Sequence, residues 1–284
     1  MKTRVFFCAF LMLMACFVTA AQQQNQPLTF WYEYHVTPGK EEEFLNLVKT
    51  VGQPVRDKLM ADGVVLAWGM EAPLLRIPDA ATHLIWYTVA DYAGVEKVDA
   101  AMRAQIAKMT EEAAKGASGK KGAAAGTAPM EQIRSITDFA KTHDYLTRDL
   151  VEGFAPSMPP AGTLPWVRYA FAKVKPGKGA EYRKAWEKYN KPVFDKLAAD
   201  GTLLAFGLAV EDVRTEGDFT HYTWLATRDL ASQDKIRAAF LADRDKRSPE
   251  EQEAITHLFT SLTDPDASRT ELVRSLIFHL PAPK

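Results

Sequence analysis

The chain contains a duplicated segment, and this duplication constrains the fold more than any other feature of the sequence. A constant shift of 138 positions aligns residues 31–104 with residues 169–242 without a gap, and 26 of these 74 pairs are identical. The identical pairs include Pro38/Pro176, Gly63/Gly201, Gly69/Gly207, His83/His221 and Trp86/Trp224. Because an internal repeat means that one structural unit occurs twice, we expect two similar halves.

Both copies show the same order of predicted elements. An aromatic, β-branched strand ends at a Pro-Gly turn, and an amphipathic helix interrupted by Pro54 or Pro192 follows it. Two further strands and a second helix complete the aligned part. The predicted strands are 29–36, 64–70 and 83–89 in the first copy and 166–174, 202–208 and 221–227 in the second; the second helices are 91–107 and 229–242.

This order, closed by a last strand in each copy, predicts an α+β protein with two tandem ferredoxin-like βαββαβ repeats. One such repeat leaves a sheet face uncovered, so we expect the two repeats to pack as one intrachain, pseudo-dimeric α/β barrel. The predicted domains are repeat 1 at 28–156, a Pro-rich linker at 157–165 and repeat 2 at 166–284. We expect the Gly, Ala and Lys run at 115–127 to be a solvated loop.

The N-terminal residues 1–21 have the pattern of a secretory signal peptide. Lys2 and Arg4 precede an apolar run at 5–18, and small residues follow at Ala20 and Ala21. We therefore predict an exported protein, periplasmic or secreted. Leu13-Met14-Ala15-Cys16 also resembles a bacterial lipobox, and lipidation of Cys16 would make the protein a lipoprotein. Without lipidation we expect no stable association with a membrane.

Both cysteines, Cys8 and Cys16, lie in this predicted signal, so cleavage would leave no disulfide, thiolate or cysteine–metal chemistry. Of 35 basic residues, 33 remain without Lys2 and Arg4, against 36 acidic residues. This slightly acidic balance gives no support for a nucleic-acid partner. The content of 47% apolar and 25% charged residues is typical of a globular protein.

The element order, the strand-Pro-Gly-helix openings at 36–40 and 174–178 and the tandem duplication resemble the dimeric α/β-barrel superfamily. That superfamily includes antibiotic-biosynthesis-type monooxygenases, stress-responsive barrel proteins and, in fused form, relatives of chlorite dismutase and dye-decolourising peroxidase. The resemblance covers nearly all of the mature chain and implies the barrel fold. It does not select one activity, because this fold carries unrelated chemistries.

Candidate catalytic residues lie on the first and third strands, which are neighbours in a ferredoxin-like sheet. Glu33 and His35 share one face of the first strand with Trp31, and His83 shares one face of the third strand with Tyr87. If the two faces coincide, Glu33, His35 and His83 form a cluster suited to acid–base catalysis. The second copy has Phe171 and Lys173 in place of Glu33 and His35, so we predict no metal site.

Trp31, Tyr87, Arg148, His221 and Arg274 are candidate ligand-binding residues. Alternatively, His83 and His221 only satisfy local backbone groups. Arg148 and Arg274 either pair with a buried acid or face a polar cavity. For Trp86, Trp224 and Trp68 we expect packing between the sheet and the helices.

The leading hypothesis is an exported barrel protein that binds a small organic ligand, with little or no catalysis. We expect no cofactor: the haem-binding relatives take their axial histidine from a helical region, whereas His83 and His221 begin strands. One alternative is a cofactor-independent monooxygenase or isomerase that uses Glu33, His35 and His83. A purely structural or interaction role is the second alternative. We expect a monomer with pseudo-two-fold symmetry, or a dimer of it.

Overall fold

The computed structural model describes residues 26–119, 128–157, 162–215, 217 and 219–280. The predicted signal peptide at 1–21, with Cys16, lies outside the described residues, as do part of the predicted linker and the last four residues. Export, lipidation and the domain boundaries therefore stay predictions.

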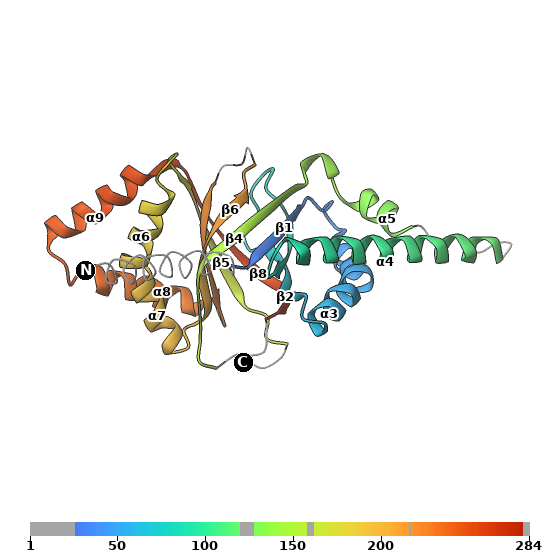
Figure 1. Cartoon of the computed structure of the whole chain (residues 1–284), viewed down its shortest axis with the longest axis horizontal. Helices are drawn as coiled ribbons and strands as arrows, with labels where there is room; N and C mark the ends of the chain where they lie inside the picture. The colour runs from blue at the N-terminus through green and yellow to red at the C-terminus, as the bar shows by residue number, and fades with distance from the viewer. Residues whose placement is uncertain (1–25, 120–127, 158–161, 216, 218, 281–284) are drawn as a thin grey trace, which may run out of the picture.

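Eight strands close into one antiparallel barrel, in the order β1-β3-β2-β8-β5-β7-β6-β4 (Figure 1). The strands are β1 (Leu28–Tyr34), β2 (Val65–Pro73), β3 (His83–Val89), β4 (His143–Phe154), β5 (Trp166–Val174), β6 (Leu203–Val213), β7 (His221–Thr227) and β8 (Thr263–His279). The predicted intrachain barrel is confirmed at this level, as a closed eight-stranded α+β barrel. Closure leaves no strand edge unpaired.

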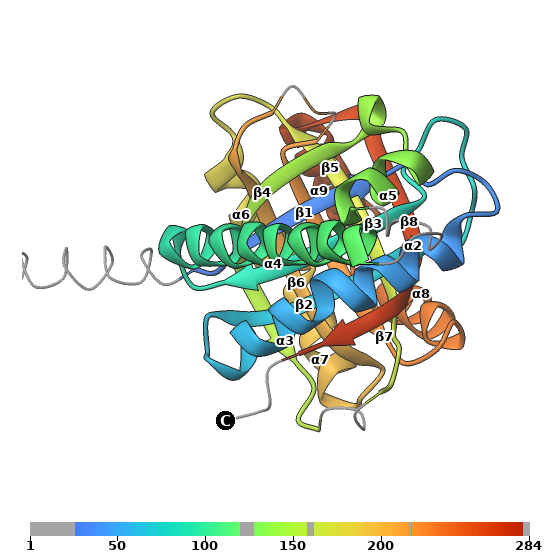
Figure 2. The same ribbon diagram turned by 90° about the vertical axis from the view of Figure 1, so that its right-hand side faces the viewer.

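The helices pack outside the barrel in two groups, one on each side (Figures 1 and 2). The first group is α2 (Glu41–Leu47), the π-helical turn η1 (Val48–Gly52), α3 (Gln53–Ala61), α4 (Tyr92–Gly119) and α5 (Pro129–Ile136), followed by the short 3-10 turn η2 (Phe139–Lys141). The second group is α6 (Gly179–Tyr189), α7 (Lys191–Ala199), α8 (Ala231–Arg244) and α9 (Pro249–Leu262). The first group packs on β1, β2 and β3 and the second on β5, β6 and β7, while β4 contributes Leu146 to the first layer and Leu150 to the second.

The predicted helix interruptions are confirmed. Proline lacks the N–H that a continuous helix needs, so it is tolerated only in a first turn. Pro54 therefore lies in the first turn of α3, after the π-helical turn η1, and Pro192 lies in the first turn of α7. The prediction for the run at 115–127 is wrong at its start, because α4 continues to Gly119. A Glu111–Lys115 ion pair of 2.6 Å, between residues four apart on the helix, supports its last turns.

The apolar core has three layers. One lies between the first helix group and its strands and includes Phe44, Trp68 and Tyr87, and a second lies between the other helix group and its strands and includes Trp186 and Phe206. The third fills the barrel interior, where strands of both halves meet. Trp68 thus packs under helices as predicted, whereas the prediction for Trp86 and Trp224 is wrong: both point into the barrel.

Two glycines at equivalent positions make room for these inward indole rings. Gly69 lies opposite Trp86 in the β2–β3 ladder, and Gly207 lies opposite Trp224 in the β6–β7 ladder. A Cβ at Gly69 would lie 2.8 Å from the Trp86 ring, and one at Gly207 would lie 2.5 Å from Nε1 of Trp224. Each ring therefore lies directly over a strand that carries no side chain at that point.

We expect Gly207→Ala to lower the free energy of unfolding by about 1–3 kcal/mol, because the methyl group forces the Trp224 ring to move. Urea denaturation followed by circular dichroism measures this change. Gly179→Ala is the matched control, since a Cβ there meets its nearest atom at 3.7 Å, an ordinary contact. Equal stability of the two variants would contradict the close packing of Trp224 on Gly207.

Candidate functional site

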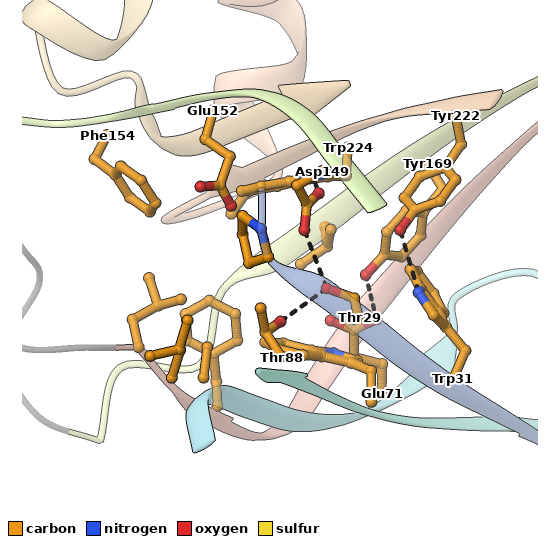
Figure 3. Close-up of a pocket in the computed structure, with 18 residues that line it drawn as sticks. Thr29, Trp31, Glu71, Thr88, Asp149, Glu152, Phe154, Tyr169, Tyr222 and Trp224 are labelled. Carbon is orange, nitrogen blue, oxygen red and sulfur yellow. Dashed lines mark hydrogen bonds between the residues drawn. The ribbon is translucent and has the colours of Figure 1, made fainter. Parts of the chain in front are cut away.

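A cavity of about 130 Å³ opens at one end of the barrel interior, where β1 begins and β4 and β8 end (Figure 3). Equivalent positions of both halves line it, so the site belongs to neither half alone. The equivalent pairs are Thr29/Val167, Trp31/Tyr169, Trp86/Trp224, Thr88/Ala226 and Phe154/Leu280. Its wall is largely aromatic and apolar, with three carboxyl groups: Glu71, Asp149 and Glu152.

Asp149 is 5% exposed and is held by two side-chain donors. Nε1 of Trp224 donates to its Oδ1 at 3.1 Å, and Oγ1 of Thr29 donates to its Oδ2 at 3.1 Å. Since Thr29 has only one hydroxyl proton, Thr88, 2.9 Å away, donates to Thr29. Burial raises the pKa of Asp149 to about 6, although the two donors oppose this rise.

Glu71 is fully buried at the inner part of the cavity. Its Oε2 accepts a hydrogen bond from the Tyr169 hydroxyl at 2.9 Å, whereas its Oε1 has no hydrogen-bond partner among the described residues. Burial raises its pKa to about 7, although the Tyr169 hydroxyl and the Trp86 indole N–H oppose this rise. Nε1 of Trp86, which lines the same cavity, is also buried without a completed hydrogen bond. The cavity therefore has polar atoms in its wall that the protein does not satisfy.

Glu152 lies at the mouth of the cavity beside Phe154 (Figure 3). Partial burial, and then the charge of Asp149, raise its pKa to about 8. Because the Glu152 side chain is exposed to solvent, water weakens both effects on its pKa. Most of the free-energy cost of removing carboxylates from water therefore falls on Glu71 and Asp149.

A hydrogen-bonded aromatic layer closes the inner end of the cavity. Nε1 of Trp31 donates to the Tyr222 hydroxyl at 3.2 Å and to Oγ1 of Thr147 at 3.3 Å. The Trp31 ring meets the rings of Tyr169 and Tyr222 edge-on, with centroids 4.9 and 5.2 Å apart. Trp31, a predicted ligand-binding residue, thus lines this cavity.

A second cavity, of about 760 Å³, lies at the other end of β1 and includes Glu33 and His35. Burial and the nearby Glu271 carboxylate raise the pKa of Glu33 to about 7, against the opposing charge of Arg269. Burial and the charge of Lys141 lower the pKa of His35. The structure therefore brings Glu33 and His35 to one cavity.

His83 does not join them. Residues directly opposite in a ladder share a face, and Glu33 lies opposite Leu84 while His83 lies opposite Tyr34. Glu33 points into the barrel, whereas the His83 ring packs against Phe44 of α2, with centroids 5.3 Å apart. The predicted cluster of Glu33, His35 and His83 is therefore not formed.

The other predicted ligand-binding residues lie outside the barrel interior. Tyr87 packs in the helix-covered layer, and the His221 ring packs against Tyr182 of α6, with centroids 5.3 Å apart. Arg148 pairs at 2.7 Å with Asp212, an acid that is only half-buried, and Arg274 is exposed. None of these four lines the barrel cavity.

Sequence reasoning missed the three carboxyls of the cavity. The signal was the disagreement between the copies: Ala209 stands at the position equivalent to Glu71 under the shift of 138. The last strands of the two copies align with a shift of 126 positions. Under this shift Ser275 is equivalent to Asp149, and Phe278 is equivalent to Glu152. Strand faces had to be assigned before these differences could be placed in one cavity.

Two further observations bear on the site. In the described ranges, no group of three or more His, Cys, Asp or Glu side chains is arranged to hold a metal ion. No helix within those same ranges is long and apolar enough to cross a membrane.

Comparison with known proteins relates the chain to solved structures only, since no protein-family profile and no curated protein sequence matches it. A candidate monooxygenase from Fusobacterium nucleatum superposes with a TM-score of 0.59 at 13% identity, over 92% of this chain and 97% of that one. A candidate monooxygenase from Lactobacillus acidophilus gives 0.53 at 8% identity, over 89% and 99%. An anthrone oxidase-like protein gives 0.51 at 11% identity, over 92% and 97%. At these identities the likeness shows a shared α+β barrel fold.

His83 and His221 generate a prediction about acid stability. They are 3% and 6% exposed, and burial lowers the pKa of each to about 4. Between pH 6.5 and 4 the unfolded chain takes up protons at these sites and the folded chain does not, so stability falls as pH falls. We expect each histidine to cost up to about 3 kcal/mol across this window.

His83→Phe keeps the contact with Phe44 and removes the titration, so its unfolding free energy should decline less steeply between pH 6.5 and 4 than that of the parent. Denaturant unfolding at several pH values measures the slope. Thr256→Phe, which adds a phenyl ring at an exposed position of α9 and removes no titrating group, is the control and should leave the slope unchanged. An unchanged slope in His83→Phe would show that His83 is protonated in the folded protein.

Proposed function

We propose that this protein binds a small organic molecule in the barrel cavity lined by Trp31, Asp149 and Trp224. The observation that carries the proposal is the cavity itself. Protein interiors are close-packed and leave few voids larger than a water molecule, whereas this barrel keeps about 130 Å³ open. Largely apolar walls with a few polar groups are typical of ligand sites.

The size of the cavity indicates the size of the ligand. Apolar cavities of about 150 Å³ accept a single benzene-sized ring. An eight-stranded barrel is also just wide enough to hold side chains or one small ligand. We therefore infer a ligand with one ring or an equally small apolar group, and a polar group that meets Thr88, Asp149 or Glu152.

We further infer that each half is a ferredoxin-like unit and that the two halves form a pseudo-dimer within one chain. The strand orders β4-β1-β3-β2 and β8-β5-β7-β6 are equivalent, which supports this inference. Export through the signal at 1–21 is part of the proposal, and it would place the binding protein in the periplasm or outside the cell.

Filling the cavity should abolish binding without unfolding the protein. We expect the larger side chain of Ala67→Leu to fill part of the cavity that Ala67 lines. It should then remove the quenching of tryptophan fluorescence that single-ring compounds such as benzyl alcohol and benzylamine cause in the parent. Ala238→Leu, at an exposed position of α8, is the control and should bind as the parent does. Undiminished binding by a folded Ala67→Leu variant would place the ligand elsewhere.

A second candidate function is proton transfer at Glu33 in the larger cavity. The raised pKa of Glu33, about 7, suits a group that gains and loses a proton near neutral pH. This candidate uses Glu33 and His35 without His83. The hypothesis of a cofactor-independent monooxygenase or isomerase is thus kept with two of its three residues.

A carboxyl titration tests the second candidate. With ¹³C-labelled glutamate, we expect two side-chain signals that titrate near pH 7, from Glu33 and Glu71, of which one disappears in Glu33→Gln and the other in Glu71→Gln. Arg269→Gln should raise the midpoint of Glu33 further, because the guanidinium stabilises the ionised form. A midpoint near 4 would remove Glu33 as a candidate.

A further inference from the structure

We propose that the ligand of the barrel cavity is a small organic cation, an ammonium ion with a ring-sized apolar group, whose charged head lies between Asp149 and Glu152. This inference rests on the proposed function and names the class of ligand for the same site. It follows from the charges, the unsatisfied atoms and the aromatic walls of the cavity.

The charge of the cavity is unbalanced. Glu71, Asp149 and Glu152 line it, and none of the described lining residues is Lys, Arg or His. The neighbouring cation along the chain, Arg148, points away and pairs with Asp212 at 2.7 Å. Buried carboxylates are normally paired with a base or neutralised by a proton, because an unpaired charge in an apolar site is costly.

Asp149 and Glu152 line the same cavity, and the charge of Asp149 raises the pKa of Glu152. No basic side chain contributes to the pKa of either group, and burial is the main cause of both rises. The Glu152 side chain has no hydrogen-bond or ion-pair partner among the described residues, whereas the Asp149 carboxyl receives only the neutral donors Thr29 and Trp224. A cation between the two carboxyls would supply the missing partner.

Glu71 is an independent observation at the inner end of the same cavity. It is 0% exposed, and its Oε1 completes no hydrogen bond in the described part of the chain. The Trp86 indole N–H acts on this carboxyl and lowers its pKa, but it too completes no hydrogen bond, so Oε1 can still accept from a further donor. A charged amine supplies donors, whereas an anionic ligand would add a fourth acid to the cavity.

The aromatic walls favour the same class of ligand. The cavity that holds the carboxyls is also lined by Trp31, Trp86, Trp224 and Tyr222. Figure 3 labels three of these rings: Trp31, Trp224 and Tyr222. Tryptophan and tyrosine rings attract organic ammonium ions through the negative potential over their faces, and this attraction grows when water is excluded. The apolar part of the ligand gains from the same surfaces.

The duplication supports a single orientation of the ligand. All three acids lie on the first half, while Ala209, Ser275 and Phe278 occupy the equivalent positions on the second half. The cavity therefore has one acidic wall and one apolar wall. A ligand with one charged end and one apolar end matches this asymmetry.

Isothermal titration calorimetry of the full mature chain with three compounds of one skeleton tests the inference. The compounds are benzylamine, benzyl alcohol and benzoate at pH 7.5. We expect benzylamine to bind at least about tenfold more tightly than benzyl alcohol, and benzoate to bind most weakly. Glu152→Gln, at the exposed mouth, should reduce the affinity for benzylamine several-fold and leave that for benzyl alcohol unchanged. Glu253→Gln, an exposed acid on α9, is the matched control.

The outcomes separate the two levels of the proposal. If benzyl alcohol binds as tightly as benzylamine, the proposal of a cationic ligand is wrong, and the proposal of a small-molecule site remains. The same conclusion follows if Glu152→Gln and Asp149→Asn both keep the full preference for the amine, or if benzoate binds more tightly than benzylamine. If none of the three compounds binds at millimolar concentration, both the cation and the proposed function are overturned.

Discussion

Each half of this chain forms a sheet face that its own helices cannot cover, and the burial of these two faces against each other holds the barrel together. The outer faces pack under helices through Phe44, Trp68 and Trp186. The inner faces contribute Trp31, Tyr169 and Tyr222 to one shared layer. Because the β2–β8 and β4–β6 ladders also join the halves, neither half is complete without the other. Closure removes every exposed edge and places the space of the barrel between the two copies.

The barrel interior is packed unevenly, and this unevenness creates the site. Around Trp31, Tyr169 and Tyr222 the rings pack edge-on and their polar atoms are satisfied. Toward the end of β4 the chain instead buries carboxyls against indole rings and leaves about 130 Å³ open. Burying Asp149 and Glu71 opposes folding, since their raised pKa values mean that the ionised forms are less stable inside than in water. A ligand that partners them would recover part of this cost, so binding and stability are coupled.

Much of the fold could be predicted from the sequence because the repeat and the side-chain periods are local signals. The strands, the helix interruptions at Pro54 and Pro192 and the barrel all follow from them, whereas α4 extends to Gly119, where glycine and lysine had suggested a loop. The site was less predictable. Trp31 lies in the cavity, and Glu33 and His35 share a second cavity, but His83 and Tyr87 lie under the helices. The two-residue period groups residues within a strand and does not say which group faces inward.

The sequence by itself determined the number of repeats, the order of elements and the positions where the copies differ. These properties depend on neighbours along the chain, such as a glycine after a helix or an apolar residue at every second position. Only the tertiary structure decided which strand face turns inward. That choice places His83 against Phe44, Glu33 in the larger cavity, and Glu71, Asp149 and Glu152 around one space. The physical reason is that the inner and outer faces of these strands are both apolar and aromatic, so hydrophobicity alone does not distinguish them. The pairing between strands that are far apart in the chain decides which face turns inward.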